Sequence, residues 1–448
     1  MPRSKAALLV SLLGCTQPAP NLGEPEVEPL PAAEASSHGQ RPNLGHASYG
    51  DDITELVRVQ NQPGSEPQAP TRKGVVSPTP FRPRVTRTEN GFEAAIPNST
   101  RIPTPAIHSG RLVAGGINGR EMYGLDALTG KTVWALNLSD DGPSEPACED
   151  GICVFNTYSC TTFAVDAATG KHLWSWYLGS PQMATTVVSG GVVYASYPDY
   201  NGPAGYKFVL GAFALETGEP QWRRWLDGEV NSAPVAHDGH IYLASRMGTL
   251  YQFKAKDGAV ESVLRNRIAT PPVLTERGVL FGAEPLPPEN NLLAAARPLF
   301  PALENRDVPP QPVEAKPRPL VAKHRLISID KYGAVVARHH MTGRELWSAR
   351  LEGVQAANVA EPLSYAGKSI LLATSSGSVV RLEPESGSVS DTFQLSKSPL
   401  SSQPIAVDGW IYAGTQDGKL VGYDTGKVEL TGWPMLGGTA DRQGKVGD

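Results

Sequence analysis

The segment FAVDAATGKHLW, residues 163–174, repeats an earlier segment, YGLDALTGKTVW, at residues 123–134. Each copy has an apolar run, a turn built on Thr-Gly, and a second run that ends in tryptophan. Glycine permits the positive φ that a tight turn between two strands requires, so each copy predicts a β-hairpin. Neither copy contains a catalytic or phosphate-binding motif. The repeat therefore indicates a structural role for this motif.

A second pattern extends this repeat along most of the chain. Short apolar segments recur, each followed by a turn and another apolar strand, with their second positions at Pro105, Pro146, Thr186, Pro234, Pro272, Pro319, Pro362 and Pro404. A spacing of 38 to 48 residues between units built from strands is typical of β-propeller blades. We therefore expect an all-β fold, an eight-bladed β-propeller over residues 91–444.

The fifth unit departs from the others, and this affects the number of blades. After its inner strands the sequence becomes rich in proline, with 10 prolines in residues 285–319. If residues 270–318 are a degenerate fifth blade, the propeller has eight blades. If they are an insertion, it has seven, which is the alternative count.

Four of the Thr-Gly turns are followed by a tryptophan four residues after the glycine: Gly130 with Trp134, Gly170 with Trp174, Gly218 with Trp222, and Gly343 with Trp347. A large aromatic side chain at this point would pack against the neighbouring blade, and its N–H would need an acceptor there. Asp126 and Asp166 are placed to accept hydrogen bonds from backbone donors of their turns. We interpret this set as blade-docking residues and assign no catalytic, cofactor-binding or metal-binding residue.

The N-terminal region differs in composition from the rest. Residues 1–14 have a basic start and a short apolar run, as in a signal peptide, and Leu12-Leu13-Gly14-Cys15 resembles a bacterial lipobox. We expect lipidation at Cys15, the alternative being an ordinary signal peptide. Residues 15–90 are rich in proline and poor in apolar clusters, which predicts a disordered tether, with a short helix at 51–62.

Three further cysteines and two histidine pairs are the remaining candidate site residues. Cys148 and Cys153 flank a turn, so that a disulfide between them is one reading, with Cys160 unpaired; three buried thiols are the other. His237 and His240 flank a hairpin tip, and His339-His340 occupy the place that Asp126 has in its own repeat. We interpret both histidine pairs as polar turn residues rather than metal ligands.

The pattern in GLDALTGKTVW and AVDAATGKHLW resembles the PQQ-type, or quinoprotein-like, β-propeller repeat. One branch of this family comprises PQQ-dependent dehydrogenases, which hold Ca²⁺ and the quinone in the central channel. Another branch is non-catalytic and includes the lipid-anchored propeller of the outer-membrane β-barrel assembly machinery. The resemblance implies a non-catalytic binding or scaffold module without a cofactor. The alternative is a periplasmic oxidoreductase that uses PQQ with Ca²⁺.

Charge and composition limit the partners. A net charge of −5, from 40 basic and 45 acidic residues, offers no basic face for nucleic acid. We expect contact with the membrane only through the lipid anchor, one or more protein partners in the cell envelope, and a monomeric propeller. The expected location is the outer membrane, facing the periplasm.

Overall fold

Two-residue turns connect the apolar runs into antiparallel hairpins. In the computed structural model the turn residues Asp150 (φ 48°) and Gly151 (φ 82°) both have positive φ, as in the type I′ turn that matches the twist of paired strands. The chain divides into the units Met1–Asn43 and Leu44–Asp448. The structure describes residues 67 and 70–72 and most of 76–437, with larger gaps at 179–185, 284–296, 299–317 and 352–362 and a few gaps of one or two residues.

The first four sheets of the described part follow one another in chain order and are numbered here from first to fourth. Their strands are β5 (Ala106–His108), β6 (Arg111–Gly115), β7 (Glu121–Asp126) and β8 (Thr132–Asn137); β9 (Ala147–Glu149), β10 (Ile152–Asn156), β11 (Thr161–Asp166) and β12 (His172–Tyr177); β13 (Val187–Ser189), β14 (Val192–Pro198), β15 (Phe208–Ala214) and β16 (Pro220–Leu226); β17 (Val235–His237), β18 (His240–Ala244), β19 (Thr249–Lys254) and β20 (Val260–Arg265).

The fifth to seventh sheets and the last sheet complete the series. Their strands are β21 (Ile268–Thr275), β22 (Gly278–Ala283) and β23 (Arg297–Pro298); β24 (Leu320–Ala322), β25 (Arg325–Ile329), β26 (Ala334–His339) and β27 (Glu345–Arg350); β28 (Leu363–Ala366), β29 (Ser369–Ala373), β30 (Ser378–Leu382) and β31 (Val389–Gln394); β32 (Ile405–Val407), β33 (Trp410–Gly414) and β34 (Lys419–Asp424) joined by β4 (Gly91–Ala95) and β3 (Arg84–Thr88).

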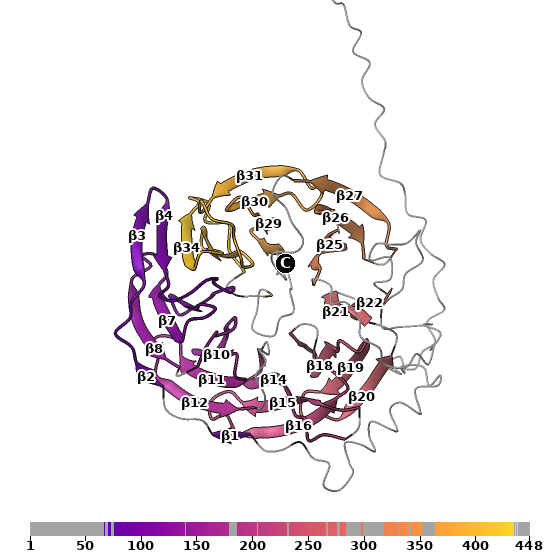
Figure 1. Cartoon of the computed structure of the whole chain (residues 1–448). Helices are drawn as coiled ribbons and strands as arrows, with labels where there is room; N and C mark the ends of the chain where they lie inside the picture. Colours follow the sequence, from indigo (N-terminus) through magenta and orange to yellow (C-terminus); the bar gives the residue numbers. More distant parts are fainter. Residues whose placement is uncertain are drawn as a thin grey trace, which may run out of the picture. The chain divides into compact units, whose positions relative to one another are not determined.

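The sheets lie around a ring in chain order, which is the β-propeller expected from the sequence (Figure 1). Seven of them have four or five strands and are complete blades, which is the lower of the two expected counts. The fifth sheet has only three strands in the described part of the chain. This is the unit whose sequence becomes proline-rich after its two inner strands.

The ring closes by joining the two ends of the described chain in one sheet. Strand β4, near the N-terminal end, pairs with β34, so that Leu420 lies opposite Ala94 and Gly422 opposite Phe92. Residues 91–95 thus supply the fourth strand of the last blade. Closure of this kind removes an exposed strand edge.

The predicted tether is wrong at its C-terminal end. Residues 71–88, here called the N-terminal belt, contain the two-residue strands β1 (Thr71–Arg72) and β2 (Ser77–Pro78) and the longer β3. They add a fifth strand to the second, the first and the last sheets respectively. Two-residue edge strands carry no alternation that sequence reasoning could find, and proline is tolerated at a sheet edge. The propeller therefore starts near residue 71, not 91.

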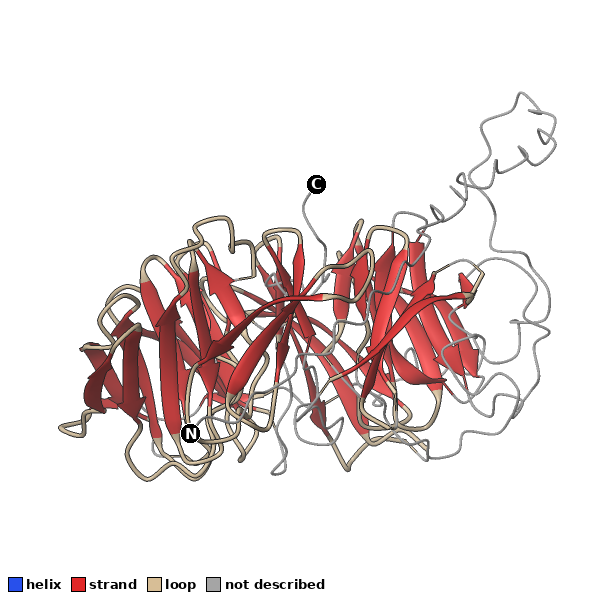
Figure 2. Cartoon of the chain, turned by 90° about the horizontal axis from the view of Figure 1, so that it is seen from above, coloured by secondary structure: helices blue, strands red, loops and turns tan. Residues whose placement is uncertain are grey.

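The remaining N-terminal predictions, which are the signal peptide 1–14, Cys15 and the helix at 51–62, lie outside the described residues. Every regular element of the described part is a strand (Figure 2). No helix in that part is long and apolar enough to cross a membrane. The middle strands are buried on both faces, as in β7 and β11, because each sheet packs between two neighbours. This explains their continuous apolar runs.

Candidate functional site

The repeat tryptophans are not free to bind a ligand, because each is hydrogen-bonded to the next sheet. The indole Nε1–H of Trp134 donates to the carbonyl of Ala167 at 2.9 Å, and that of Trp174 donates to the carbonyl of Leu215 at 2.7 Å. Trp222 and Trp347 make the equivalent bonds to Ala255 and Pro384, at 2.9 and 2.8 Å. In the first three cases the acceptor directly follows the last residue of the third strand of the following sheet, and Pro384 lies two residues after the end of β30.

The turn glycines lie beneath these rings. A Cβ added at Gly170 would come within 2.5 Å of the Trp134 ring, and one added at Gly218 within 2.5 Å of the Trp174 ring. Such distances leave no room for any side chain. The tryptophan of one sheet thus packs on the Thr-Gly turn of the following sheet, and the repeated motif serves to dock one blade against the next.

The interface between the last sheet and the first performs the same task with two residues. Phe92 of β4 packs against Gly130, where an added Cβ would come within 2.4 Å of its ring. The hydroxyl of Tyr412 donates to the carbonyl of Ala127 at 3.0 Å, the acceptor that tryptophan finds elsewhere. Sequence reasoning missed both residues because they lie more than 300 positions apart. The outer-strand pattern around Phe92 was the available signal.

The turn aspartates have the role expected of them. Asp126 Oδ1 accepts from the backbone N–H and from the hydroxyl of Thr129, at 2.8 and 2.6 Å, and Asp166 does the same with Thr169. The threonine hydroxyl bond, followed by the backbone bonds, lowers the pKa of both carboxyl groups against the opposing effect of burial. Both carboxylates are therefore structural parts of a turn.

Polar contacts also join the inner hairpins of neighbouring sheets. His108 Nε2 accepts a hydrogen bond from the N–H of Gly151 at 2.9 Å, so this nitrogen carries no proton. Burial lowers the pKa of His108, and the nearby Asp150 opposes that effect. One sheet further on, the Glu149 carboxylate accepts from the N–H groups of Gly190 and Gly191.

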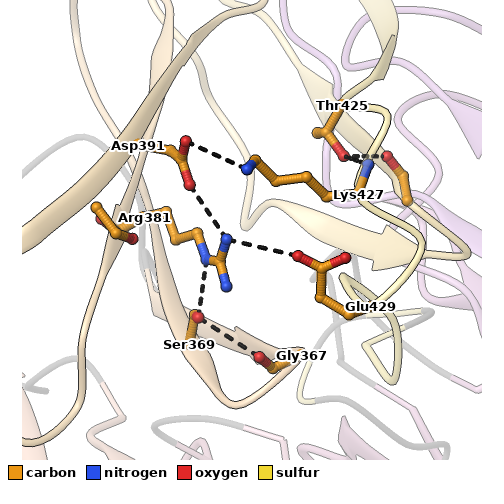
Figure 3. A network of polar contacts seen from close by, with 9 residues as sticks. Gly367, Ser369, Arg381, Asp391, Thr425, Lys427 and Glu429 are labelled. Carbon is orange, nitrogen blue, oxygen red and sulfur yellow. Dashed lines mark hydrogen bonds and ion pairs between the residues drawn. The ribbon is translucent and has the colours of Figure 1, made fainter.

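The interface between the seventh and last sheets has an ionic cluster at the place where other joints have the repeat tryptophan (Figure 3). Asp391 stands four residues after Gly387, where other repeats have tryptophan. It pairs with Arg381 at 3.1 Å and with Lys427 at 3.6 Å. Arg381 also lies 3.7 Å from the carboxylate of Glu429, and its Nε donates to the Ser369 hydroxyl at 2.8 Å. This ionic cluster fixes the chain after β34 to the seventh sheet.

Beyond that cluster the chain turns to the inner edge of the ring. We call residues 427–437 the C-terminal strap; residues 427–433, 435 and 437 of it are described. Trp433 and Ala406 of β32 exchange two backbone hydrogen bonds, at 2.8 and 3.1 Å. Because β32 is the innermost strand of its sheet, the strap lies on the axial side of the last blade.

A buried amide holds the end of the strap. The Gln403 side-chain oxygen accepts from the Trp433 indole at 3.0 Å and from the N–H of Gly437 at 2.9 Å. Its Nε2 donates to the carbonyl of Leu363 in the seventh sheet. Trp433 belongs to the apolar core of the last, first, sixth and seventh sheets, whereas Met435 belongs to that of the first four. The strap therefore contacts both halves of the ring.

The strap covers the inner edge of the last blade, where β32 faces the ring axis. Trp433 lies on the inner edge of β32, and the side-chain oxygen of Gln403 accepts two hydrogen bonds while its Nε2 donates one. Among the described residues no group of three or more His, Cys, Asp or Glu side chains could hold a metal ion.

The structure places the remaining candidates in separate parts of the ring. Cys148 and Cys153 form a disulfide across the β9–β10 hairpin, with their Cα atoms 4.1 Å apart, and Cys160 is a buried free thiol. Burial raises the pKa of Cys160 to about 12.

The histidine pairs also occupy turns. His240 contacts Glu261 at 2.6 Å at the start of β18. The carbonyl of His339 accepts from Gly343, as that of Asp126 accepts from Gly130. The position of His339 in its turn is thus the one that the sequence indicated.

These features define a β-propeller of PQQ-like repeats in which the repeated motif docks blade against blade. A family model described as PQQ_2, outer membrane protein assembly factor BamB, matches residues 87–205, 208–272 and 301–431. Since this is well over half of the sequence, the chain belongs to that family.

Two curated relatives resemble parts of the chain. It is 31% identical over 144 residues to outer membrane protein assembly factor BamB of Yersinia pestis, covering 30% of this chain and 35% of the relative. It is also 31% identical over 176 residues to the dehydrogenase subunit of the quinone alcohol dehydrogenase of Gluconobacter oxydans (strain 621H), covering 35% and 23%. The match thus spans about a third or less of either relative.

A solved structure supports the fold alone. The crystal structure of the computationally designed Ika8 protein matches with a TM-score of 0.56 and 18% identity, covering 74% of this chain and 98% of Ika8. At this identity the likeness carries no information on function.

Proposed function

We propose that this chain is a non-catalytic binding and scaffold module of the bacterial cell envelope that acts in outer-membrane protein assembly. Membership of the family described as outer membrane protein assembly factor BamB supports this proposal. The observation that carries it is the use of the repeat motif: the indole N–H of Trp134, Trp174 and Trp222 is bonded to the next sheet. These indole N–H groups are therefore not available to bind a substrate.

The proposal includes a lipid anchor and an eight-bladed ring. Leu12-Leu13-Gly14-Cys15 supplies the lipobox pattern, and several acyl chains on one cysteine would hold the protein at the membrane. Strand β21 contacts both β18 and β24. On that ground we count its sheet as the degenerate fifth blade of an eight-bladed ring.

Fractionation and co-purification test this function. The full chain carries an affinity tag and is extracted from membranes with detergent, beside a Cys15→Ser control. We expect the unaltered protein in the membrane fraction together with β-barrel assembly proteins, and the variant in the soluble fraction. Unaltered protein that is soluble and brings down no assembly protein would count against the proposal.

The second candidate is a PQQ-dependent oxidoreductase of the periplasm. The similarity to the quinone alcohol dehydrogenase subunit favours it. Against it stands the covered inner edge of β32, where Trp433 and Gln403 bind each other. A PQQ-dependent reduction of dye with alcohols or sugars as donors would support this candidate.

A further inference from the structure

The C-terminal strap has the anchoring pattern of a bound peptide. Its buried side chains are Leu430, Trp433 and Met435, with relative exposures of 0, 2 and 4%. Val428 is 77% exposed, and Thr431 and Gly432 between the anchors are exposed as well. Alternating anchors and exposed positions are how an extended peptide lies in a groove.

The partners of the strap come from two sheets and form a continuous track. The seventh sheet supplies Arg381 and Asp391 to Glu429 and Lys427, and the N–H of Gly367 to the carbonyl of Thr431 at 3.1 Å. These contacts lie at the outer end of the track.

The last sheet supplies the inner end. The N–H of Gly409 donates to the carbonyl of Leu430 at 3.0 Å, and Ala406 and Gln403 then bind Trp433. Apart from Gln403, which precedes β32, these groups belong to strands or hairpin turns that pair within their own sheets. The track is therefore made of elements that have hydrogen-bonded partners in their own sheets.

The strap is joined to the propeller through an exposed glycine. Gly426 has a φ of 66°, and nothing lies within 4 Å of a Cβ built on it. Strand β34 ends two residues earlier, at Asp424. The covalent connection thus passes through a point that makes no packing contact, and the strap is held by its anchors.

We propose that the track between the seventh and last sheets is a peptide-binding groove, occupied in cis by the C-terminal strap, and that it binds the same segment supplied in trans. The ligand class is an extended peptide with the spacing Leu-x-x-Trp-x-Met. The backbone hydrogen bonds at Ala406 and Gly409 set the direction of the peptide. The hydrogen bond from the tryptophan indole to Gln403 sets its register, and the ionic cluster binds its N-terminal end. This inference does not depend on the proposed function.

The test cuts the strap from the folded protein. A protease recognition sequence is inserted between Gly426 and Lys427 of the full chain, and the uncut protein with the same insertion is the control for folding. After cleavage we expect an unchanged circular dichroism spectrum and retention of the fragment on gel filtration. An excess of a fluorescein-labelled peptide of residues 427–437 should then replace the fragment and raise the fluorescence anisotropy.

Peptide variants show whether the anchors decide binding. A Trp433→Ala peptide should bind more than about tenfold more weakly, because a buried aromatic anchor dominates such a contact. A Val428→Ala peptide should bind within about twofold of the original, because that side chain is exposed. Loss of the folded spectrum on cleavage, release of the fragment without rebinding of the labelled peptide, or equal binding of the two variants would each overturn the proposal.

Discussion

Substitution of Gly218 isolates the contribution of blade docking. Gly218 (φ 71°) lies under the Trp174 ring, whereas Gly239 (φ 72°) lies in an open hairpin turn with nothing within 4 Å of an added Cβ. Alanine at either position must adopt a left-handed backbone conformation, which costs about 1 to 2 kcal/mol. Only Gly218→Ala also forces a methyl group to within 2.5 Å of the ring.

The difference between the two variants gives the size of the docking effect. Overpacking of a well-packed site costs about 1 to 3 kcal/mol, so we expect Gly218→Ala to lower the free energy of unfolding by about 2 kcal/mol more than Gly239→Ala does. Urea denaturation of the full chain followed by circular dichroism measures both. In a Trp174→Ala background the ring is gone, and the two glycine variants should then cost the same.

Two results would refute this reasoning. Equal destabilisation by the two alanines in the unaltered protein would mean that the turn glycine is not a seat for the indole. Persistence of the difference in the Trp174→Ala background would mean that the difference has another origin than the contact between the ring and the glycine.

Three further predictions concern the joints of the ring. Burial lowers the pKa of His108, so the folded state favours the neutral imidazole. The free energy of unfolding should be highest above the pKa of histidine in the unfolded chain, about 6.5, and should fall as the pH drops below that value. His108→Gln should flatten this dependence in thermal melts from pH 7.5 to 5. The Cys148–Cys153 disulfide closes a short loop, so its reduction should cost about 2 kcal/mol by the loop-entropy relation, measured by urea unfolding with and without reductant; an unchanged midpoint would contradict this. Removal of residues 1–66 should leave the melting temperature of the ring unchanged, whereas removal of 1–90 strips the N-terminal belt from three sheets and should lower it by several degrees.

The regular blades could be predicted from the sequence because each carries its own turn and its own tryptophan. Gly130, Gly170 and Trp174 lie in copies that share Asp, Thr, Gly and Trp at the same spacing, and their contacts follow from one blade to the next. The degenerate fifth unit could be recognised by its proline content. Its third strand, Arg297–Pro298, has two residues and no pattern to recognise.

The joints between distant segments could not be predicted in this way. Strands β1 and β2 of the belt are too short to show alternation, and prolines made the belt resemble a tether. Phe92 and Tyr412 divide between them a task that one tryptophan performs elsewhere. Asp391 replaces an aromatic residue with a charge whose partners, Arg381 and Lys427, lie on either side of it in the sequence. In each case the contact depends on how separate strands pack together, which local sequence does not encode.

Calorimetric titration of the full-length protein with PQQ, with and without Ca²⁺, combined with a dye-reduction assay on alcohols and sugars, tests the central claim most directly. If the propeller is a non-catalytic module whose inner edge is covered by its own strap, we expect no saturable heat and no PQQ-dependent reduction. Binding at a ratio of one to one with turnover of any of these donors would contradict the claim and identify the protein as an oxidoreductase.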